Sequence, residues 1–351
     1  MRDLLSDYER FVASGRPFGR AVVTSVWGSA PRPEGSSMLA TATGIIAGSV
    51  SGGCVETATA LEIETAIARG SPKLVTFGVT NERAWEVGLA CGGTIKVFVE
   101  PSVRPEVLQA ARGDGGEVVV SVIEGPGLGE SARVLADGRT EGMPSTAVPT
   151  EGMRNAALAA LRKEASTSQT LETVDGPVTL FFEVFPRHPK LVIFGGNQTA
   201  VALVPLAKAL GYHTVVADGR QAFLDPERFP QADELILAWP AEAFERIGID
   251  SACYVCVLSH DPKFDEPALS IALRSPAAYV GAIGSKKTQA SRREQLREAG
   301  LSEAEVERLH GPIGLDLGGR QPAEIALSIL AEMTAVRYGG KVKREEKSRA
   351  G

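Results

Sequence analysis

The sequence predicts an α/β protein with an N-terminal mixed α/β domain over residues 1–185 and a C-terminal Rossmann-like parallel-sheet domain over residues 190–338. Three observations support this prediction. The chain has 351 residues, which is longer than a typical single domain. Its second half alternates β-rich runs with helical stretches, as βαβ units do. Between the halves, the segment Pro186–Pro189 carries two prolines and no periodicity, so we place the domain boundary there.

The first domain mixes helices and strands. Residues 2–14 form a short amphipathic helical pattern, and the helix-forming run after Glu56 ends at Gly70, a usual helix stop. Two prolines and two glycines keep residues 27–35 irregular. We expect helices at 2–14, 57–69 and about 151–164, an extended segment at 45–47, and strands at 19–26, 37–41, 73–77, 94–99, 117–123, 131–136, 169–174 and 177–185.

The second domain repeats short strands and helices. Its last helix carries apolar residues such as Ile329 and Met333, which suit it to cover one face of a sheet. The residues after it, 339–351, are charged and unpatterned, which predicts a disordered tail. We expect strands at 190–194, 213–217, 233–237, 252–258 and 278–281, and helices at about 198–210, 241–247, 262–274, 286–299 and 321–338.

Composition excludes several classes of protein. The net charge of −6 argues against a general nucleic-acid binder, whose domains are normally basic. Four cysteines in a chain of this size are not a disulfide framework and favour reduced thiols in a cytoplasm. Charges interrupt the apolar residues of the N-terminus, unlike a signal peptide, and no run is long enough to span a membrane. We therefore expect a cytoplasmic soluble protein, and a homodimer because that is the commonest assembly.

The loop Gly48–Glu56 is the most informative stretch of the chain. It is rich in glycine and serine, and it brings Ser51, Gly52, Gly53 and Cys54 to the start of a predicted helix. Free amides at a helix start favour anions, and a thiol there tends toward the reactive thiolate. A second cysteine, Cys91, is followed by Gly92 and Gly93. Two interpretations stay open: a site for an anionic or sulfur-rich group, or small buried cysteines beneath tight turns.

The turn after the first strand of the second domain resembles a dinucleotide fingerprint. Gly195, Gly196 and Ala200 fit the pattern, and Asp218 at the end of the next strand is placed to hold a ribose hydroxyl. Asn197, however, replaces the glycine that lets the backbone approach a pyrophosphate, which weakens the prediction of NAD(P) binding. A Rossmann-like scaffold without a nucleotide is the alternative.

His260 and Asp261 follow a predicted strand at the carboxyl edge of the sheet, where such folds carry their sites. The histidine could act as an acid, a base or a metal ligand, whereas Asp261 could simply cap the next helix. Cys253 and Cys256 have redox-pair spacing but lie within a predicted strand, on opposite faces, so we expect buried core thiols. Ser285 and Lys286 could offer a helix start to an anion, or form a solvated helix end.

Together these segments resemble the XdhC/CoxI family of accessory proteins, which mature molybdenum hydroxylases such as xanthine dehydrogenase and carbon monoxide dehydrogenase. The residues that carry the resemblance span nearly the whole chain. They are Gly28–Gly35, Gly48–Glu56, Cys91–Gly93, Leu258–Asp265, Tyr279–Thr288, Gly311–Gly319 and Pro322–Met333. One departure lies at residues 195–200, where the family more often has a Gly-Ala-Gly-His type of turn.

The resemblance implies an accessory factor rather than an enzyme. Such a protein binds the molybdenum cofactor (molybdopterin), protects it while a sulfido ligand is installed, and inserts it into the apo-form of a molybdenum hydroxylase, with a cysteine desulfurase as a second partner. Cys54 and Cys91 would then contact molybdenum or sulfur, or relay sulfur, while Arg32 and the amides of Gly52 and Gly53 would hold anionic groups. The further cofactor-binding candidates are Ser51, Gly92, Gly93, Gly195, Gly196, Asp218, His260 and Asp261. An NAD(P)-dependent oxidoreductase with His260 as acid or base is the alternative from a different class.

Overall fold

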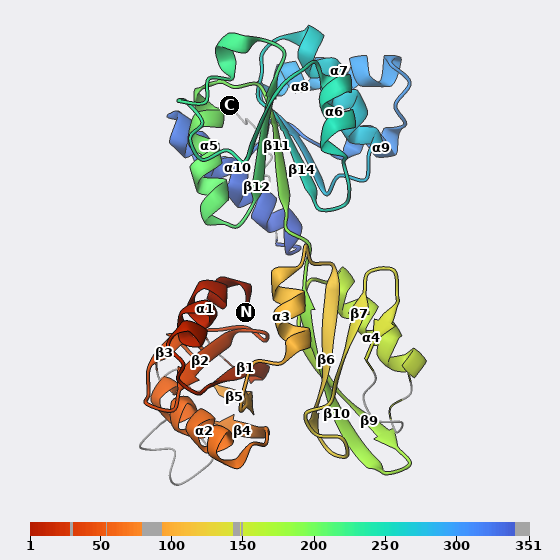
Figure 1. Cartoon of the computed structure of the whole chain (residues 1–351). Helices are drawn as coiled ribbons and strands as arrows, with labels where there is room; N and C mark the ends of the chain where they lie inside the picture. Colours follow the sequence, from red (N-terminus) through yellow and green to blue (C-terminus); the bar gives the residue numbers. More distant parts are fainter. Residues whose placement is uncertain (29–30, 54, 79–92, 143–147, 149, 341–351) are drawn as a thin grey trace, which may run out of the picture. The chain divides into compact units, whose positions relative to one another are not determined.

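The computed structural model describes residues 1–28, 31–53, 55–78, 93–142, 148 and 150–340. The chain divides into two compact units, Met1–Arg187 and His188–Gly351. Each unit has its own sheets and its own hydrophobic cores, and each is drawn in Figure 1. No helix of the described residues has both the length and the apolar character needed to cross a membrane.

The first unit contains two antiparallel five-stranded sheets. The first has the order β3-β2-β1-β5-β4 and the second the order β8-β7-β6-β10-β9. The strands of the first are β1 (Phe18–Trp27), β2 (Ser37–Thr41), β3 (Ile46–Gly48), β4 (Lys73–Phe77) and β5 (Thr94–Glu100). Those of the second are β6 (Glu117–Glu124), β7 (Ser131–Leu135), β8 (Thr140–Glu141), β9 (Thr167–Thr173) and β10 (Gly176–Phe185).

Helices cover both sheets of this unit. Helix α2 (Glu56–Arg69) packs on the first sheet through Ile63 and Ala66, and it ends at Gly70, which adopts the left-handed conformation that favours glycine. Helix α4 (Thr150–Arg162) packs on the second sheet. The remaining elements are the 3₁₀ turn η1 (Arg2–Leu4), α1 (Leu5–Ala13) and α3 (Pro105–Arg112), which share one apolar cluster.

A buried group of charges joins the two sheets. Arg20 of β1 is completely buried, and it donates hydrogen bonds to Glu100 at the end of β5 (3.0 Å), to Ser37 of β2 (2.8 Å) and to Glu183 of β10 in the second sheet. Arg104 donates to Ser121 of β6 (2.7 Å) and also pairs with Glu100. Because buried charges are costly without partners, the ion pair between Arg20 and Glu183 links β1 of the first sheet to β10 of the second.

The second unit has one six-stranded parallel sheet in the order β13-β12-β11-β14-β15-β16, which is the Rossmann order. Its apolar clusters lie on both faces: one includes side chains of α5 and α10, the other those of α6 and α7, as Figure 1 also shows. The strands are β11 (Lys190–Phe194), β12 (His213–Asp218), β13 (Glu234–Leu237), β14 (Cys253–Val257), β15 (Tyr279–Ala282) and β16 (Leu309–His310). The helices are α5 (Gln198–Ala209), η2 (Gln221–Phe223), α6 (Pro240–Ile247), α7 (Pro262–Arg274), α8 (Lys286–Glu298), α9 (Glu303–Glu307) and α10 (Pro322–Arg337).

The predicted fold class is confirmed, with helices over antiparallel sheets in the first unit and a Rossmann sheet in the second. The sequence prediction omitted α3, α9 and the short strands β8 and β16. The predicted disordered tail lies outside the described residues from position 341 onward.

Candidate functional site

Three loops leave the same end of the first sheet. Trp27, the last residue of β1, pairs with Thr94, the first residue of β5, and Phe77 of β4 pairs with Ile95, so the end of β1, the end of β4 and the start of β5 lie at one end. The end of β3 reaches it too, because Gly48 pairs with Met38 at the start of β2. These are the stretches that carry Arg32, Cys54 and Cys91 in the sequence. The described residues flanking both cysteines therefore belong to one end of one sheet.

The loop after β3 is built around the carboxylate of Glu56. Oε1 accepts hydrogen bonds from the amides of Val50 (3.2 Å), Ser51 (2.9 Å) and Gly52 (3.0 Å) and from the Ser49 hydroxyl (2.7 Å). Oε2 accepts from the amides of Gly53 (2.8 Å) and Val55 (3.2 Å) and from the Ser51 hydroxyl (2.8 Å). Glu56 thus supplies the anion that this glycine-rich loop surrounds.

This environment changes the pKa of Glu56 and the expected role of the loop. Partial burial acts to raise the pKa, but the hydrogen bonds from Ser49 and Ser51 outweigh it and lower the pKa to about 2. The sequence led us to expect the amides of Gly52 and Gly53 to hold an anionic group of a cofactor. In the structure both donate to Glu56, and the Ser51 side chain is buried against it, so an external anion would have to displace this carboxylate.

Arg32 lies in the loop after β1, at this end of the sheet. Its Nε is buried and has no hydrogen-bond partner among the described residues. Glu34, two residues further along the chain, accepts a hydrogen bond from the Val26 amide (3.1 Å). Pro31, next to Arg32, packs against the Glu56 loop, because a Cβ at Gly52 would lie 3.4 Å from Pro31 Cγ. A buried donor without an acceptor is suited to an anionic ligand.

The predicted cofactor residues Cys54, Cys91 and Gly92 lie outside the described residues, and Gly93 is buried directly before β5. Among the described side chains, no group of three or more His, Cys, Asp or Glu residues could hold a metal ion. Any role of the two cysteines therefore stays a prediction.

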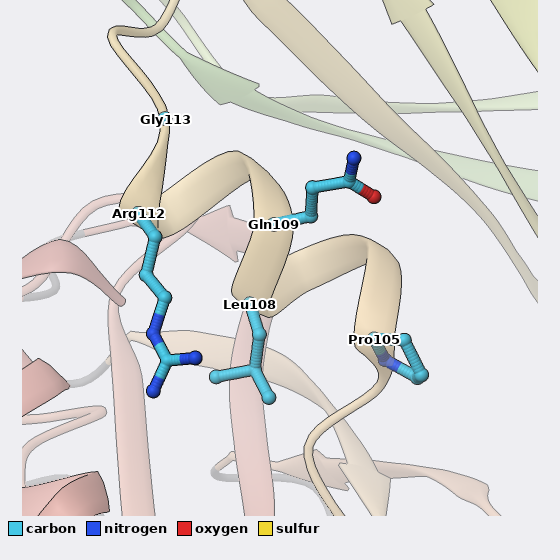
Figure 2. Close-up of a pocket in the computed structure, with 5 residues that line it drawn as sticks. All are labelled: Pro105, Leu108, Gln109, Arg112 and Gly113. Atoms are coloured by element: carbon cyan, nitrogen blue, oxygen red, sulfur yellow. The ribbon is translucent and has the colours of Figure 1, made fainter.

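A separate hollow of about 530 Å³ opens on α3, lined by Pro105, Leu108, Gln109, Arg112 and Gly113. Figure 2 shows Leu108 and Arg112 projecting from one side of the helix and Gln109 from another. Arg112 is engaged with the Tyr8 ring (5.7 Å) and Glu9 (3.5 Å). None of the predicted site residues lines this hollow, and it contains no nucleophile or acid, so we do not assign it chemistry.

In the second unit, hydrogen bonds of Asn197 hold the glycine-rich turn to its own helix and to the residue that follows β14. Asn197 caps α5, since its Oδ1 accepts from the Ala200 amide (3.0 Å), and its Nδ2 donates to the Leu258 carbonyl (2.7 Å). Gly195 has a φ of +103°, and a Cβ there would come within 2.6 Å of the Ser259 amide nitrogen. Asn197 therefore has a structural reason to replace the usual glycine.

Asp218 does not present a free carboxylate to a ribose. It is fully buried, and Oδ2 accepts from the Gly196 amide (3.1 Å). The Arg220 guanidinium bridges both of its oxygens, from Nε to Oδ1 and from Nη2 to Oδ2, each at 2.9 Å. Sequence reasoning missed Arg220, although its position two residues after the acidic strand end was a usable signal.

His260 is exposed after β14, and Asp261 caps α7 by accepting from the Lys263 amide (3.1 Å), as the alternative interpretation predicted. Behind them, buried Asp265 accepts from the Ser259 hydroxyl and pairs with Arg292 (3.0 Å). Burial raises the pKa of Asp265, while the hydrogen bond from Ser259 and the charge of Arg292 act in the opposite direction. The ion pair between Asp265 and Arg292 links α7 to α8 behind this edge of the sheet.

The cysteine pair of β14 and the serine before α8 have structural roles. Cys253 and Cys256 are free and buried, as predicted, and burial raises the pKa of both thiols. Ser285 caps α8 by accepting a hydrogen bond from the Thr288 amide (3.1 Å).

Comparison with known proteins identifies the family. Residues 191–333 match the model of the XdhC Rossmann domain, and residues 11–78 match that of the XdhC and CoxI family. Two curated relatives match most of the chain. A Bacillus subtilis protein, named as a probable subunit of xanthine dehydrogenase, is 27% identical over 95% of this chain and 95% of its own length. The Escherichia coli protein "Molybdenum cofactor insertion chaperone PaoD" is 27% identical over 92% of this chain and 85% of its own.

A solved structure has the same fold. The crystal structure of a Bacillus halodurans protein described as a xanthine dehydrogenase superposes with a TM-score of 0.74, at 26% identity and 97% coverage of both chains. The family models fall in both units of the structure, and the relatives extend across both. The chain belongs to the XdhC and CoxI family.

Proposed function

We propose that this protein binds the molybdenum cofactor as cargo, protects it and inserts it into a molybdenum hydroxylase. The observation that carries the proposal is that the loop with Arg32 and the stretches flanking Cys54 and Cys91 leave the same end of one sheet. The PaoD relative, named as a molybdenum cofactor insertion chaperone, supports the same role. The client is a hydroxylase of the xanthine dehydrogenase or carbon monoxide dehydrogenase type.

The residues at this end suit the two chemical parts of the cargo. Molybdopterin carries a dithiolene, which holds the molybdenum, and a terminal phosphate. Thiolates of Cys54 and Cys91 are soft ligands for molybdenum or its sulfur. The buried Nε of Arg32, which has no acceptor among the described residues, would donate to an anionic oxygen.

Glu56 fixes the loop that carries Cys54 in this proposal. It binds the amides on both sides of that residue, from Gly53 (2.8 Å) and Val55 (3.2 Å). A loop held by seven hydrogen bonds places a ligand with little loss of conformational freedom on binding. Glu56 is therefore a positioning residue, and support of sulfuration by a cysteine desulfurase would use the same loop.

The test measures cofactor bound to protein purified from cells that make molybdopterin. The full chain, Cys54→Ala, Cys91→Ala and the double variant are compared for molybdenum content and for pterin fluorescence after oxidation. Each single change should reduce the amount of cofactor that the protein retains. The double change should reduce it only slightly more than the more damaging single change, because the effects of groups that act as a unit are not additive. Cys256→Ala, in the buried core of the second unit, is the matched control.

Two outcomes would contradict the proposal. If the cysteines are core residues, each change lowers the melting temperature and leaves retention per folded molecule intact. If the client hydroxylase is fully active in cells that make only the double cysteine variant, the proposed role of the two thiols in cofactor insertion is wrong. Turnover of a small carbonyl with tight NAD(P) binding would instead favour the oxidoreductase alternative.

A further inference from the structure

An exposed tryptophan lies at the carboxyl edge of the Rossmann sheet. Trp239 follows β13 and leaves 53% of its surface exposed. Its ring covers the backbone of Gly219, where a Cβ would come within 3.3 Å of the indole, and it rests on Phe264 with the ring centres 5.7 Å apart. An indole held in place yet open to solvent is suited to contact a ligand.

Arg220 directly follows Gly219, the residue whose backbone the Trp239 ring covers. The Phe223 ring lies 4.0 Å from the centre of its guanidinium, and the ion pair with Asp218 holds its edge. Its side chain is still 45% exposed. The guanidinium is thus held by Phe223 and Asp218 while the side chain as a whole stays partly exposed, and an arginine held in this way can stack on an aromatic ring.

The usual dinucleotide contacts at this edge are already made within the protein. Asp218 is paired with Arg220, and the Asn197 side chain takes up the Ala200 amide of the first turn of α5. Gly196 lies against η2, since a Cβ there would come within 2.1 Å of the Phe223 carbonyl oxygen. The partners that would bind a ribose diol and a pyrophosphate are therefore engaged, whereas the stacking surfaces are open.

We infer that Trp239 and Arg220 form a binding site for a single planar heteroaromatic ring, such as a purine or a pterin, at the carboxyl edge of the second unit. The ring stacks on the exposed indole and on the guanidinium, and a dinucleotide gains nothing beyond its base. The inference uses only residues of the second unit and does not rest on the proposed function. If the ring-binding site were disproved, the proposed function would still stand, and the reverse also holds.

The test titrates the full chain with AMP, adenosine, 6-carboxypterin and NAD⁺, using calorimetry and saturation-transfer NMR. Trp239→Leu removes the ring and keeps apolar bulk, and Arg220→Lys keeps a charge for Asp218 but removes the planar group. Each change should weaken AMP binding about tenfold, the scale of base stacking on protein side chains. Trp239→Phe should fall between wild type and Trp239→Leu, and melting temperatures report whether each variant is folded.

The matched controls are Tyr338→Leu and Arg337→Lys at the end of α10, where an exposed tyrosine lies beside a half-buried arginine with 5.4 Å between the guanidinium and the ring centre. Neither should change the affinity for AMP. A preference for AMP or for the pterin would identify the source of the ring and support the site. No binding of any probe, an unchanged affinity in either site variant, or NAD⁺ binding tenfold tighter than AMP would overturn the inference.

Discussion

Replacing Glu56 with glutamine should lower the local stability of the loop before α2. The carboxylate oxygens accept seven hydrogen bonds, and a glutamine amide turns one oxygen into a donor that faces other donors. The pKa falls from 4.5 to about 2, which by linkage corresponds to about 3 kcal/mol. Because the group is partly exposed and screened by solvent, we expect about 2 kcal/mol at pH 7.

The pH dependence of this effect has a definite sign. A carboxylate with a lowered pKa stabilises the fold above its unfolded pKa of 4.5, and this contribution is lost as the pH falls toward about 2. The difference between wild type and Glu56→Gln should be constant above about pH 5.5, and more than half of it should be gone by about pH 3. Glu64→Gln, an exposed glutamate on the same helix, is the control and should show no such trend.

Hydrogen exchange of peptides covering residues 46–60 in the full chain measures this local stability. At pH 7 the variant should exchange about 30-fold faster, the ratio that corresponds to 2 kcal/mol. Equal protection at pH 7, or a difference that persists unchanged at pH 3, would refute the account of Glu56 as the loop's resident anion.

Three further predictions concern other residues. Cys54 should be alkylated at neutral pH faster than Cys253 or Cys256, whose pKa values are raised by burial, and mass spectrometry showing equal, slow labelling would exclude an activated thiol. Arg292→Leu should lower the free energy of unfolding by about 3 kcal/mol because it leaves Asp265 buried without its partner, and urea titration of the double variant with Asp265→Leu should recover most of the loss. Asn197→Gly should cost about 1 kcal/mol because it removes the hydrogen bond to the Leu258 carbonyl, and calorimetry should show NAD⁺ binding no tighter than in wild type, because Arg220 still pairs with Asp218.

The long elements of the fold could be predicted from the sequence because local signals agree with the packing. Gly70 ends α2 in the left-handed conformation, and Pro262 and Pro322 open α7 and α10 at the first helical turn. Helix α3 was missed because eight residues carry too little propensity of their own, and Val107 and Ala110 are stabilised by packing. For α9 a signal was present, the capping box of Ser302 and Glu305.

The candidate site was less predictable, because sequence spacing does not show which group fills a loop. Glu56 stood inside the informative loop motif, yet only the fold shows that it takes the amides of Gly52 and Gly53. In the same way Asp218 was correctly placed at a strand end, but its pairing with Arg220 depends on side-chain geometry. Side chains of the protein compete with ligands for the same hydrogen bonds, and the order of residues alone does not show which of the two forms them.

The buried charges between the sheets of the first unit have a consequence for synthesis on the ribosome. Arg20 emerges 163 residues before Glu183, which lies on the last strand of that unit. At typical elongation rates this is a delay of roughly 10 to 30 s. Until then the guanidinium lacks one of its carboxylates, and dehydrating it is unfavourable. The first sheet therefore completes its packing only when β10 is delivered, and nascent chains that stop short of Glu183 should remain sensitive to protease.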